Sequence, residues 1–226
     1  MHIEPGVVDG AKMAFAYVTA AGAAGVTAKL AWDDLKDHSV ASFGLRAVAA
    51  TIGTLLFFEI LPHFSVGISE VHFILGTTLF LILGMAPAAI GLATGLLIQG
   101  TVFAPTDMPM FFVNVTTLLV PLFAIGLLAK QVIAPGTAYV DLKYAQALKL
   151  SATYQGGVIA WVAFWAFYGQ GFGAENVAAV MSFGAAYMLV ILIEPIADLA
   201  VLAAAKTGRD LMKSGGLSHN RLYEAA

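Results

Sequence analysis

The chain has 226 residues, of which 60% are hydrophobic and 11% are charged, and its formal net charge is −3. A soluble domain of this size carries roughly a quarter of charged residues, so the composition excludes an ordinary water-soluble protein. The sequence has no cysteine, which excludes disulfides and leaves nitrogen, oxygen and thioether ligands for any metal. The Lys and Arg residues form no basic stripe, so nothing predicts nucleic-acid binding.

Long apolar segments predict transmembrane helices, each of which needs about 20 residues to cross a bilayer. In chain order the segments are residues 11–32, 44–61, 72–85, 87–104, 110–130, 148–169 and 177–205. The third and fourth are nearly continuous, but one helix over both would be about 45 Å long. Gly84 and Pro87 supply a turn between them. Seven spans are therefore favoured, with six as the alternative.

The basic residues orient these spans. Lys and Arg prefer the cytoplasmic side of a membrane protein. With the N-terminus outside, ten of the eleven Lys and Arg residues face the cytoplasm and only Lys12 lies outside. We therefore expect an external N-terminus, an external loop before residue 72 and a cytoplasmic C-terminus. The ten are Lys29, Lys36, Arg46, Lys130, Lys143, Lys149, Lys206, Arg209, Lys213 and Arg221.

The first two residues form a potential metal chelator. The α-amine of Met1, the amide nitrogen of His2 and its imidazole can close adjacent five- and six-membered rings on one cation. The amide nitrogen loses its proton to ions that prefer strong, square-planar nitrogen ligands, chiefly Ni²⁺ and Cu²⁺. The opening residues lack a basic signal region, and we expect Met1 to be retained because His2 is bulky. The alternative is that His2, like many histidines near an N-terminus, binds nothing.

A fourth nitrogen ligand would have to come from another histidine. His38 and His219 fall on the cytoplasmic side, and His219 is expected to be a bystander in a short tail. His63 fits an interfacial position at the outer end of the second span. His72 enters the third span from the external loop, and an imidazole there is costly to bury without a partner. We therefore favour His72 as the ligand, with a headgroup-level histidine as the alternative.

These residues resemble the CbiM/NikM family of substrate-binding subunits of cobalt and nickel energy-coupling-factor (ECF) transporters. The opening Met1-His2-Ile3, followed by an acidic residue, a proline and Gly6, is similar to that of the family. So is the segment from Ser69 to Gly76 around His72. Weaker similarities are the Gly84–Pro87 break, Gln99, Asn114 and Glu194, while Thr117 and Tyr187 depart from the family pattern.

The resemblance implies that Met1, His2 and His72 hold Ni²⁺ or Co²⁺ as the transported substrate. It implies a multi-pass protein of a bacterial or archaeal cell membrane that contributes cobalt to cobalamin biosynthesis and is itself no enzyme. The sequence lacks a Gly-x-x-x-x-Gly-Lys-Ser/Thr phosphate loop. The implied partners are therefore a transmembrane coupling (T) subunit, separate ATP-binding cassette ATPases and a small accessory membrane subunit.

Other polar residues within or near the spans are candidates to support the ligands. Asn114 is a possible hydrogen-bond donor, and Glu59 and Glu70 flank the His72 loop. Glu194 and Asp198 lie one turn apart in the last span, where carboxylates are usually functional. The alternatives are solvation for Glu59 and Glu70, packing for Asn114, and a hydrogen-bonded kink at Pro195 for the last two.

The first span carries small residues at every fourth position, namely Ala20, Ala24 and Ala28. Such stripes allow close helix packing in membranes. The stripe fits docking of the coupling subunit, which the resemblance implies, or packing against the chain's own helices.

The sequence thus predicts an all-α integral membrane protein. We expect residues 1–206 to form one transmembrane metal-binding domain with a chelating segment at 1–10, and residues 207–226 to form a cytoplasmic tail. Two other functions stay open: a copper- or other metal-binding membrane enzyme or sensor that uses the same N-terminal chelate, and a membrane assembly protein in which His2 and His72 never meet.

Overall fold

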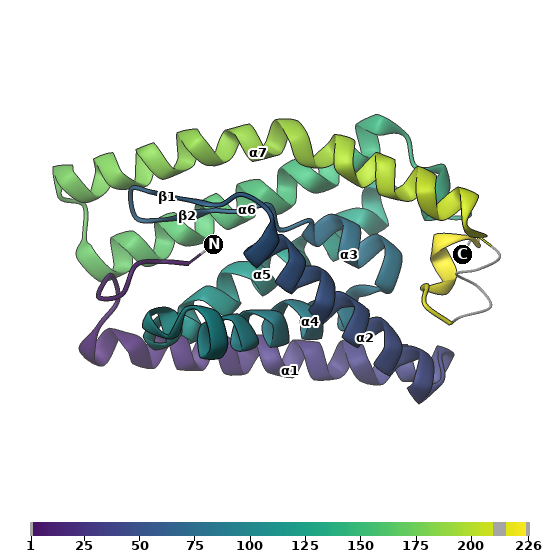
Figure 1. The fold of residues 1–226 in the computed structure, drawn as a ribbon, viewed down its shortest axis with the longest axis horizontal. Helices are drawn as coiled ribbons and strands as arrows, with labels where there is room; N and C mark the ends of the chain where they lie inside the picture. Colours follow the sequence, from purple (N-terminus) through teal and green to yellow (C-terminus); the bar gives the residue numbers. More distant parts are fainter. Residues whose placement is uncertain (1, 210–215, 225–226) are drawn as a thin grey trace.

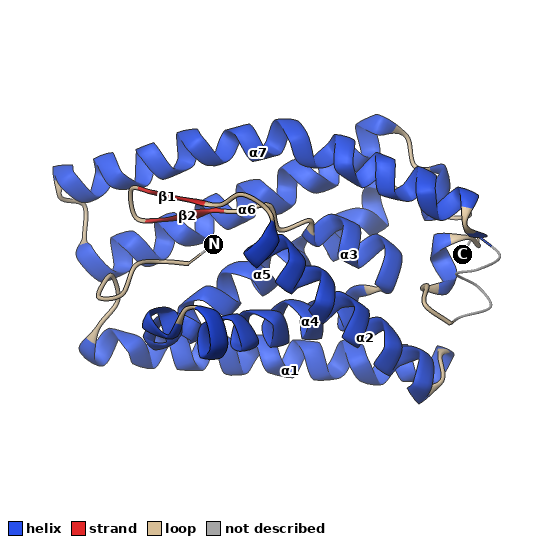
Figure 2. Ribbon diagram, viewed as in Figure 1, coloured by secondary structure: helices blue, strands red, loops and turns tan. Residues whose placement is uncertain are grey.

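A computed structural model describes residues 2–209 and 216–224 of the chain. Helices dominate the fold (Figures 1 and 2). The α-helices are α1 (Met13–Asp37), α2 (Val40–Leu55), α3 (Gly76–Leu83), α4 (Met85–Ile98), α5 (Phe111–Val132), α6 (Tyr144–Gln170) and α7 (Ala174–Thr207). Turns of π-helix at Leu56–Ile60 and Gln99–Phe103 extend α2 and α4.

Five of these helical stretches are long and apolar enough to cross a membrane. The all-α membrane class predicted from the sequence is therefore confirmed. The five stretches are Gly10–Asp37, Val40–Ile60, Met85–Phe103, Pro105–Val132 and Ala174–Thr207. With 27 residues, α6 is also long enough to cross, although less apolar.

The third predicted span differs from the expected continuous helix. Residues 72–75 belong to neither a helix nor a strand, and α3 has only eight residues, which at 1.5 Å per residue is about 12 Å. Leu75, just before α3, has a left-handed backbone with φ of 51°, which a branched residue rarely adopts. The seven predicted segments all contain a helix, but the third cannot cross a bilayer as a helix alone.

A β-hairpin lies beside α7 (Figures 1 and 2), with β1 largely exposed and β2 more buried. Strands β1 (Phe64–Val66) and β2 (Ser69–Val71) pair antiparallel, with Ser65 opposite Glu70. Gly67 forms the turn with φ of +61°, and a Cβ there would lie 2.2 Å from the carbonyl oxygen of Ala179. Only glycine satisfies both the turn and this approach to α7.

The helix α3 is enclosed by the other helices and packs against α2, α4, α5, α6 and α7. Seven of its eight residues are buried. By contrast, α1 lies along one edge of the bundle opposite α7 (Figure 1) and exposes most of its surface. The centre of the fold is thus the short helix and the extended segment that precedes it.

A buried ion pair closes the end of the bundle at which α2 begins. Arg46 is fully buried, and its guanidinium donates to both carboxylate oxygens of Asp34 and to the carbonyl of Leu83, the last at 2.8 Å. The Nδ1 atom of His38 lies 3.1 Å from the Asp34 carboxylate.

The C-terminal segment, residues 216–224, packs against this same end. The backbone N–H of His219 donates to the carbonyl of Ile82 at 2.9 Å, and Leu222 is fully buried. The Tyr223 hydroxyl donates to the carbonyl of Ala205 at 2.7 Å. His219, expected to be a bystander, therefore helps to seat the described part of the tail on the bundle.

The ion pair leads to a stability prediction. Replacing Asp34 with Ala leaves the Arg46 charge buried without its counter-ion, which costs about 3–5 kcal/mol. We expect the unfolding temperature of the purified protein in detergent to fall strongly. The matched control is Asp33→Ala next to it, because the exposed Asp33 pairs only with exposed lysines. Equal unfolding temperatures for the two variants would contradict a structural role for the buried pair.

Candidate metal centre

The N-terminal segment enters the bundle and adds to the hairpin. Ile3 bridges Ser69 antiparallel, and the backbone N–H of Glu70 donates to the carbonyl of His2 at 3.2 Å. The Ser69 hydroxyl donates to that same carbonyl at 3.0 Å. This pairing fixes the register of residue 2 against residue 70, so the position of the His2 side chain is set by β2.

Glu70 and His72 are two residues apart in an extended segment, so their side chains point to the same side. His2 is brought to that side from the paired N-terminal segment. His2 and His72 are 3% and 1% exposed, and Glu70 is about three-quarters buried. Two imidazoles and one carboxylate therefore converge in the interior, although His2 is far in the sequence from Glu70 and His72.

Both imidazoles point at one carboxylate oxygen. His2 Nδ1 lies 2.9 Å and His72 Nε2 lies 2.8 Å from Glu70 Oε2. One ligand atom from each of the three residues lies within 4.8 Å of the others, a spacing that suits ligands of a single cation. The ring nitrogens on the far sides, His2 Nε2 and His72 Nδ1, are buried and have no hydrogen-bond partner among the residues that the structure describes.

The charges favour a cation. Hydrogen bonds from the His2 and His72 imidazoles hold the pKa of Glu70 well below its usual range, so this carboxyl is ionised. Burial lowers the pKa of His2, so its imidazole is neutral at neutral pH. An anionic carboxylate between two neutral imidazoles is a set that binds divalent cations.

Aromatic rings form the walls of the centre. The His63 ring stacks on His72 with centroids 4.9 Å apart and an angle of 11°. Phe58, fully buried, lies 5.3 Å from His72 and 5.9 Å from His2. These rings restrict the orientations of both imidazoles, and they keep bulk water away from the ligand atoms.

Two further polar side chains hold the backbone that carries the histidines. Asn114 Oδ1 accepts the N–H of Ile3 at 2.9 Å. Glu194 is fully buried, and its Oε1 accepts the N–H groups of Ile74 and Leu75 at 2.9 and 3.0 Å. The other Glu194 oxygen accepts a hydrogen bond from the Gln155 amide. Asn114 thus anchors the segment after His2, and Glu194 anchors the segment after His72.

The other residues predicted from the sequence lie outside the cluster of His2, Glu70 and His72 or outside the described residues. Met1 lies outside the described residues, so its amine has no assigned position. Glu59 is half-buried in the π-helical turn after α2 and is not among the clustered ligand groups of the described chain. Asp198 is fully buried one turn beyond Glu194 and accepts a hydrogen bond from the Thr78 hydroxyl.

Sequence reasoning overlooked two contributors, Phe58 and Gln155, and assigned His63 only to an interfacial position, not to a stacking contact with His72. Gln155 is a fully buried amide within α6, and a polar residue inside an apolar segment is a signal that could have been followed. Phe58 and His63 carry no such signal, because their contacts arise from the hairpin that returns the chain toward α2.

The fold and this buried centre define a multi-pass membrane protein with a candidate cation site. A family model described as the cobalt uptake substrate-specific transmembrane region, CbiM, matches residues 2–211. The chain therefore belongs to the CbiM family, a membrane component of cobalt transporters whose substrate is cobalt. Neither a curated protein nor a solved structure matches the chain.

The anchoring by Glu194 predicts a coupled loss. Glu194→Ala leaves two buried backbone N–H groups without an acceptor, each costing about 1–3 kcal/mol, and frees the segment after His72. We expect a lower unfolding temperature together with weaker Co²⁺ binding in a calorimetric titration. Glu175→Ala, at the exposed start of α7, should change neither. Unaltered Co²⁺ affinity in Glu194→Ala would refute the positioning role.

Proposed function

We propose that this protein is the substrate-capturing subunit of an ECF-type importer and binds Co²⁺, or Ni²⁺, through Met1, His2 and His72. The ligands are the α-amine of Met1, the amide and imidazole nitrogens of His2, and an imidazole nitrogen of His72. The observation that carries the proposal is the convergence of His2 Nδ1 and His72 Nε2 on a single point. Residues 1–206 form the metal-binding membrane domain, and residues 207–226 form its cytoplasmic tail.

The His2 atom that faces this point is the one that the chelate requires. A six-membered ring through the amide nitrogen, Cα, Cβ and Cγ of residue 2 closes on Nδ1 and not on Nε2. In the structure His2 Nδ1 and His72 Nε2 both form hydrogen bonds with Glu70. A cation that binds here needs each neutral imidazole to carry its proton on the far nitrogen, His2 Nε2 and His72 Nδ1, so that the two facing nitrogens are free to coordinate it. Glu70 then remains beside the cation as a compensating charge.

Glu70, Asn114 and Glu194 have supporting roles in this proposal. Glu70 supplies negative charge beside the cation and, before the cation binds, holds His2 Nδ1 and His72 Nε2 at one point. Loss of such a neighbouring partner typically lowers metal affinity by about 10- to 100-fold. Asn114 and Glu194 hold the two backbone segments in register. Glu59 is not among the clustered ligand groups of the described residues, and we assign it no role.

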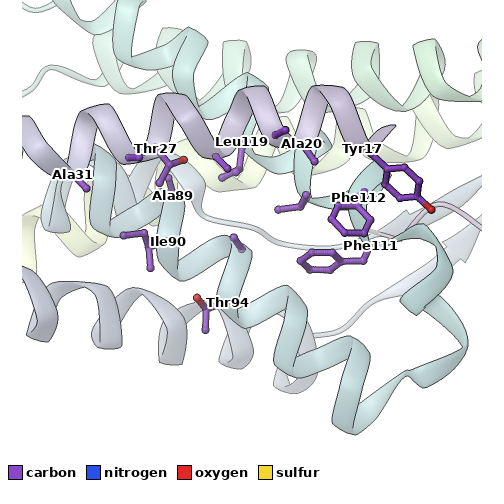
Figure 3. Close-up of a pocket in the computed structure, with 15 residues that line it drawn as sticks. Tyr17, Ala20, Thr27, Ala31, Ala89, Ile90, Thr94, Phe111, Phe112 and Leu119 are labelled. Carbon is purple, nitrogen blue, oxygen red and sulfur yellow. The ribbon is translucent and has the colours of Figure 1, made fainter. Parts of the chain in front are cut away.

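In the proposed importer the ATPases are separate proteins, and movement of this subunit depends on a transmembrane coupling subunit. A hollow of about 520 Å³ between α1, α4 and α5 suits a helix of that partner (Figure 3). Small residues of α1 and α4 line it, and Tyr17 and Phe112 meet at one end with ring centroids 5.0 Å apart. Small residues let a partner helix approach closely.

Copper capture by the same chelate is the second candidate function. The Irving–Williams order favours Cu²⁺ over Ni²⁺ and Co²⁺ at a nitrogen site. Family membership supports cobalt as the substrate. Metal analysis of protein purified with its native N-terminus, from cells grown without added copper, distinguishes the two.

The chelate predicts that metal binding depends on a free N-terminus. One residue inserted before Met1 moves the amine out of the chelate ring, so we expect loss of stoichiometric Co²⁺ and of its absorption bands. His2→Ala and His72→Ala should have the same effect. His63→Ala removes only a stacked ring and should retain one Co²⁺ per chain by elemental analysis. Full metal occupancy in the extended protein would exclude the chelate.

The hollow between α1, α4 and α5 predicts that assembly with the partners can be impaired without loss of metal binding. Ala24→Leu combined with Ala28→Leu fills the hollow on α1, so we expect reduced co-purification of the coupling subunit and ATPases while one Co²⁺ still binds. Val18→Leu, on a lipid-facing part of the same helix, should assemble normally. Normal assembly of the double variant would place the docking surface elsewhere.

A further inference from the structure

A second hollow, of about 470 Å³, lies at the opposite end of the bundle from the metal centre. Most of its lining is apolar. Its exposed members Val26 and Leu127 lie on helices that are long and apolar enough to cross a membrane, so we infer that the hollow opens toward lipid. The apolar residues come from α1, α3, α4 and α5: Val26, Leu30, Phe80, Met85, Phe123 and Leu127.

Two cations lie among this apolar lining. Lys130 is exposed in the last turn of α5 and has no ion pair within the described residues. Arg221, in the C-terminal segment, lies over the Tyr139 ring at 5.3 Å, and its Nε is buried without a hydrogen-bond partner among residues 2–209 and 216–224. No acidic residue of this described part of the chain lines the hollow, so no described carboxylate compensates the positive charge there.

His219 adds no positive charge. Burial lowers the pKa of His219 to about 4, so the imidazole is neutral at neutral pH. The net charge at this end of the hollow therefore comes from Lys130 and Arg221, which suit one anionic group.

The combination of apolar walls and two cations limits which kind of molecule can bind in this hollow. A free anion would pair with Lys130 and Arg221 but leave the apolar walls uncovered. An apolar helix of a partner would cover the walls but bury both cations without counter-charges, which is costly in a membrane. A molecule with an anionic head and a hydrocarbon chain satisfies both parts of the surface.

We propose that this hollow binds one anionic phospholipid. Its phosphate lies between Lys130 and Arg221, and one acyl chain lies along α1 and α5 toward Val26 and Phe123. The basic residues assign this end of the bundle to the cytoplasm, and cytoplasmic leaflets carry anionic lipids that basic groups near the surface recognise. The lipid also fastens the C-terminal segment to α5, because Arg221 belongs to the one and Lys130 to the other.

Native mass spectrometry of the detergent-purified full chain tests the proposal. Titration with phosphatidylglycerol should show one lipid retained at least about tenfold more tightly than phosphatidylcholine with the same acyl chains. The combined Lys130→Gln and Arg221→Gln substitutions should abolish that preference. Lys36→Gln with Lys149→Gln removes two exposed lysines outside the hollow and should preserve it.

Two further controls distinguish lipid binding from the binding of a bare anion and from misfolding of a variant. Val26→Trp keeps both cations but fills the path of the acyl chain, so it should also lose the tightly bound lipid. Inorganic phosphate should not compete at concentrations equal to those of the lipid. Each variant should still bind one Co²⁺, since the metal centre lies at the other end.

Equal retention of the two lipids by the native chain, or competition by phosphate, would overturn the proposal. Failure of Co²⁺ binding in the native chain would instead refute the metal centre alone.

Discussion

The shared contact of two imidazoles with one Glu70 oxygen is the interaction around which the rest of the fold is arranged. His2 and His72 are 70 positions apart, and neither lies in a helix. To bring them together, the N-terminus must enter the bundle and the chain after α2 must return as a hairpin. A helical bundle of plain spans has no place for either segment.

Irregular backbone inside a membrane protein needs internal hydrogen-bond partners, because lipid supplies none. The hairpin satisfies part of its own backbone, and the N-terminal segment satisfies one edge of β2. Glu194 and Asn114 supply acceptors for the N–H groups that remain next to the two histidines. This explains why a carboxylate persists in the middle of an apolar helix. The Glu194 carboxylate accepts hydrogen bonds from the N–H groups of Ile74 and Leu75, as carbonyl groups do within a helix. The segment that contains these two residues can therefore stay non-helical.

Some parts of the fold and of the candidate site could be predicted from the sequence, and others could not. Apolar length predicted the long helices. The chemistry of an N-terminal His, together with the family resemblance, singled out His2 and His72 as candidate ligands. Segment 72–85 was expected to be a continuous helix because hydropathy measures burial and does not distinguish an extended buried strand from a helix. The hairpin depends on Gly67 fitting against α7, a long-range contact that no local pattern encodes. For the same reason Glu70 was assigned to the neighbourhood of His72, but its position between the two rings was not predicted.

The two ends of the bundle are connected through α3. At one end of this helix, Glu194 holds the N–H groups of Ile74 and Leu75, directly after His72. At the other, Arg46 holds the carbonyl of Leu83, and the His219 amide holds that of Ile82. Because α3 is short, buried and closely packed, we expect it to behave as a rigid unit that does not bend. The candidate cation site is thus connected through α3 to the Arg46–Asp34 pair and to the C-terminal segment at the other end of the bundle.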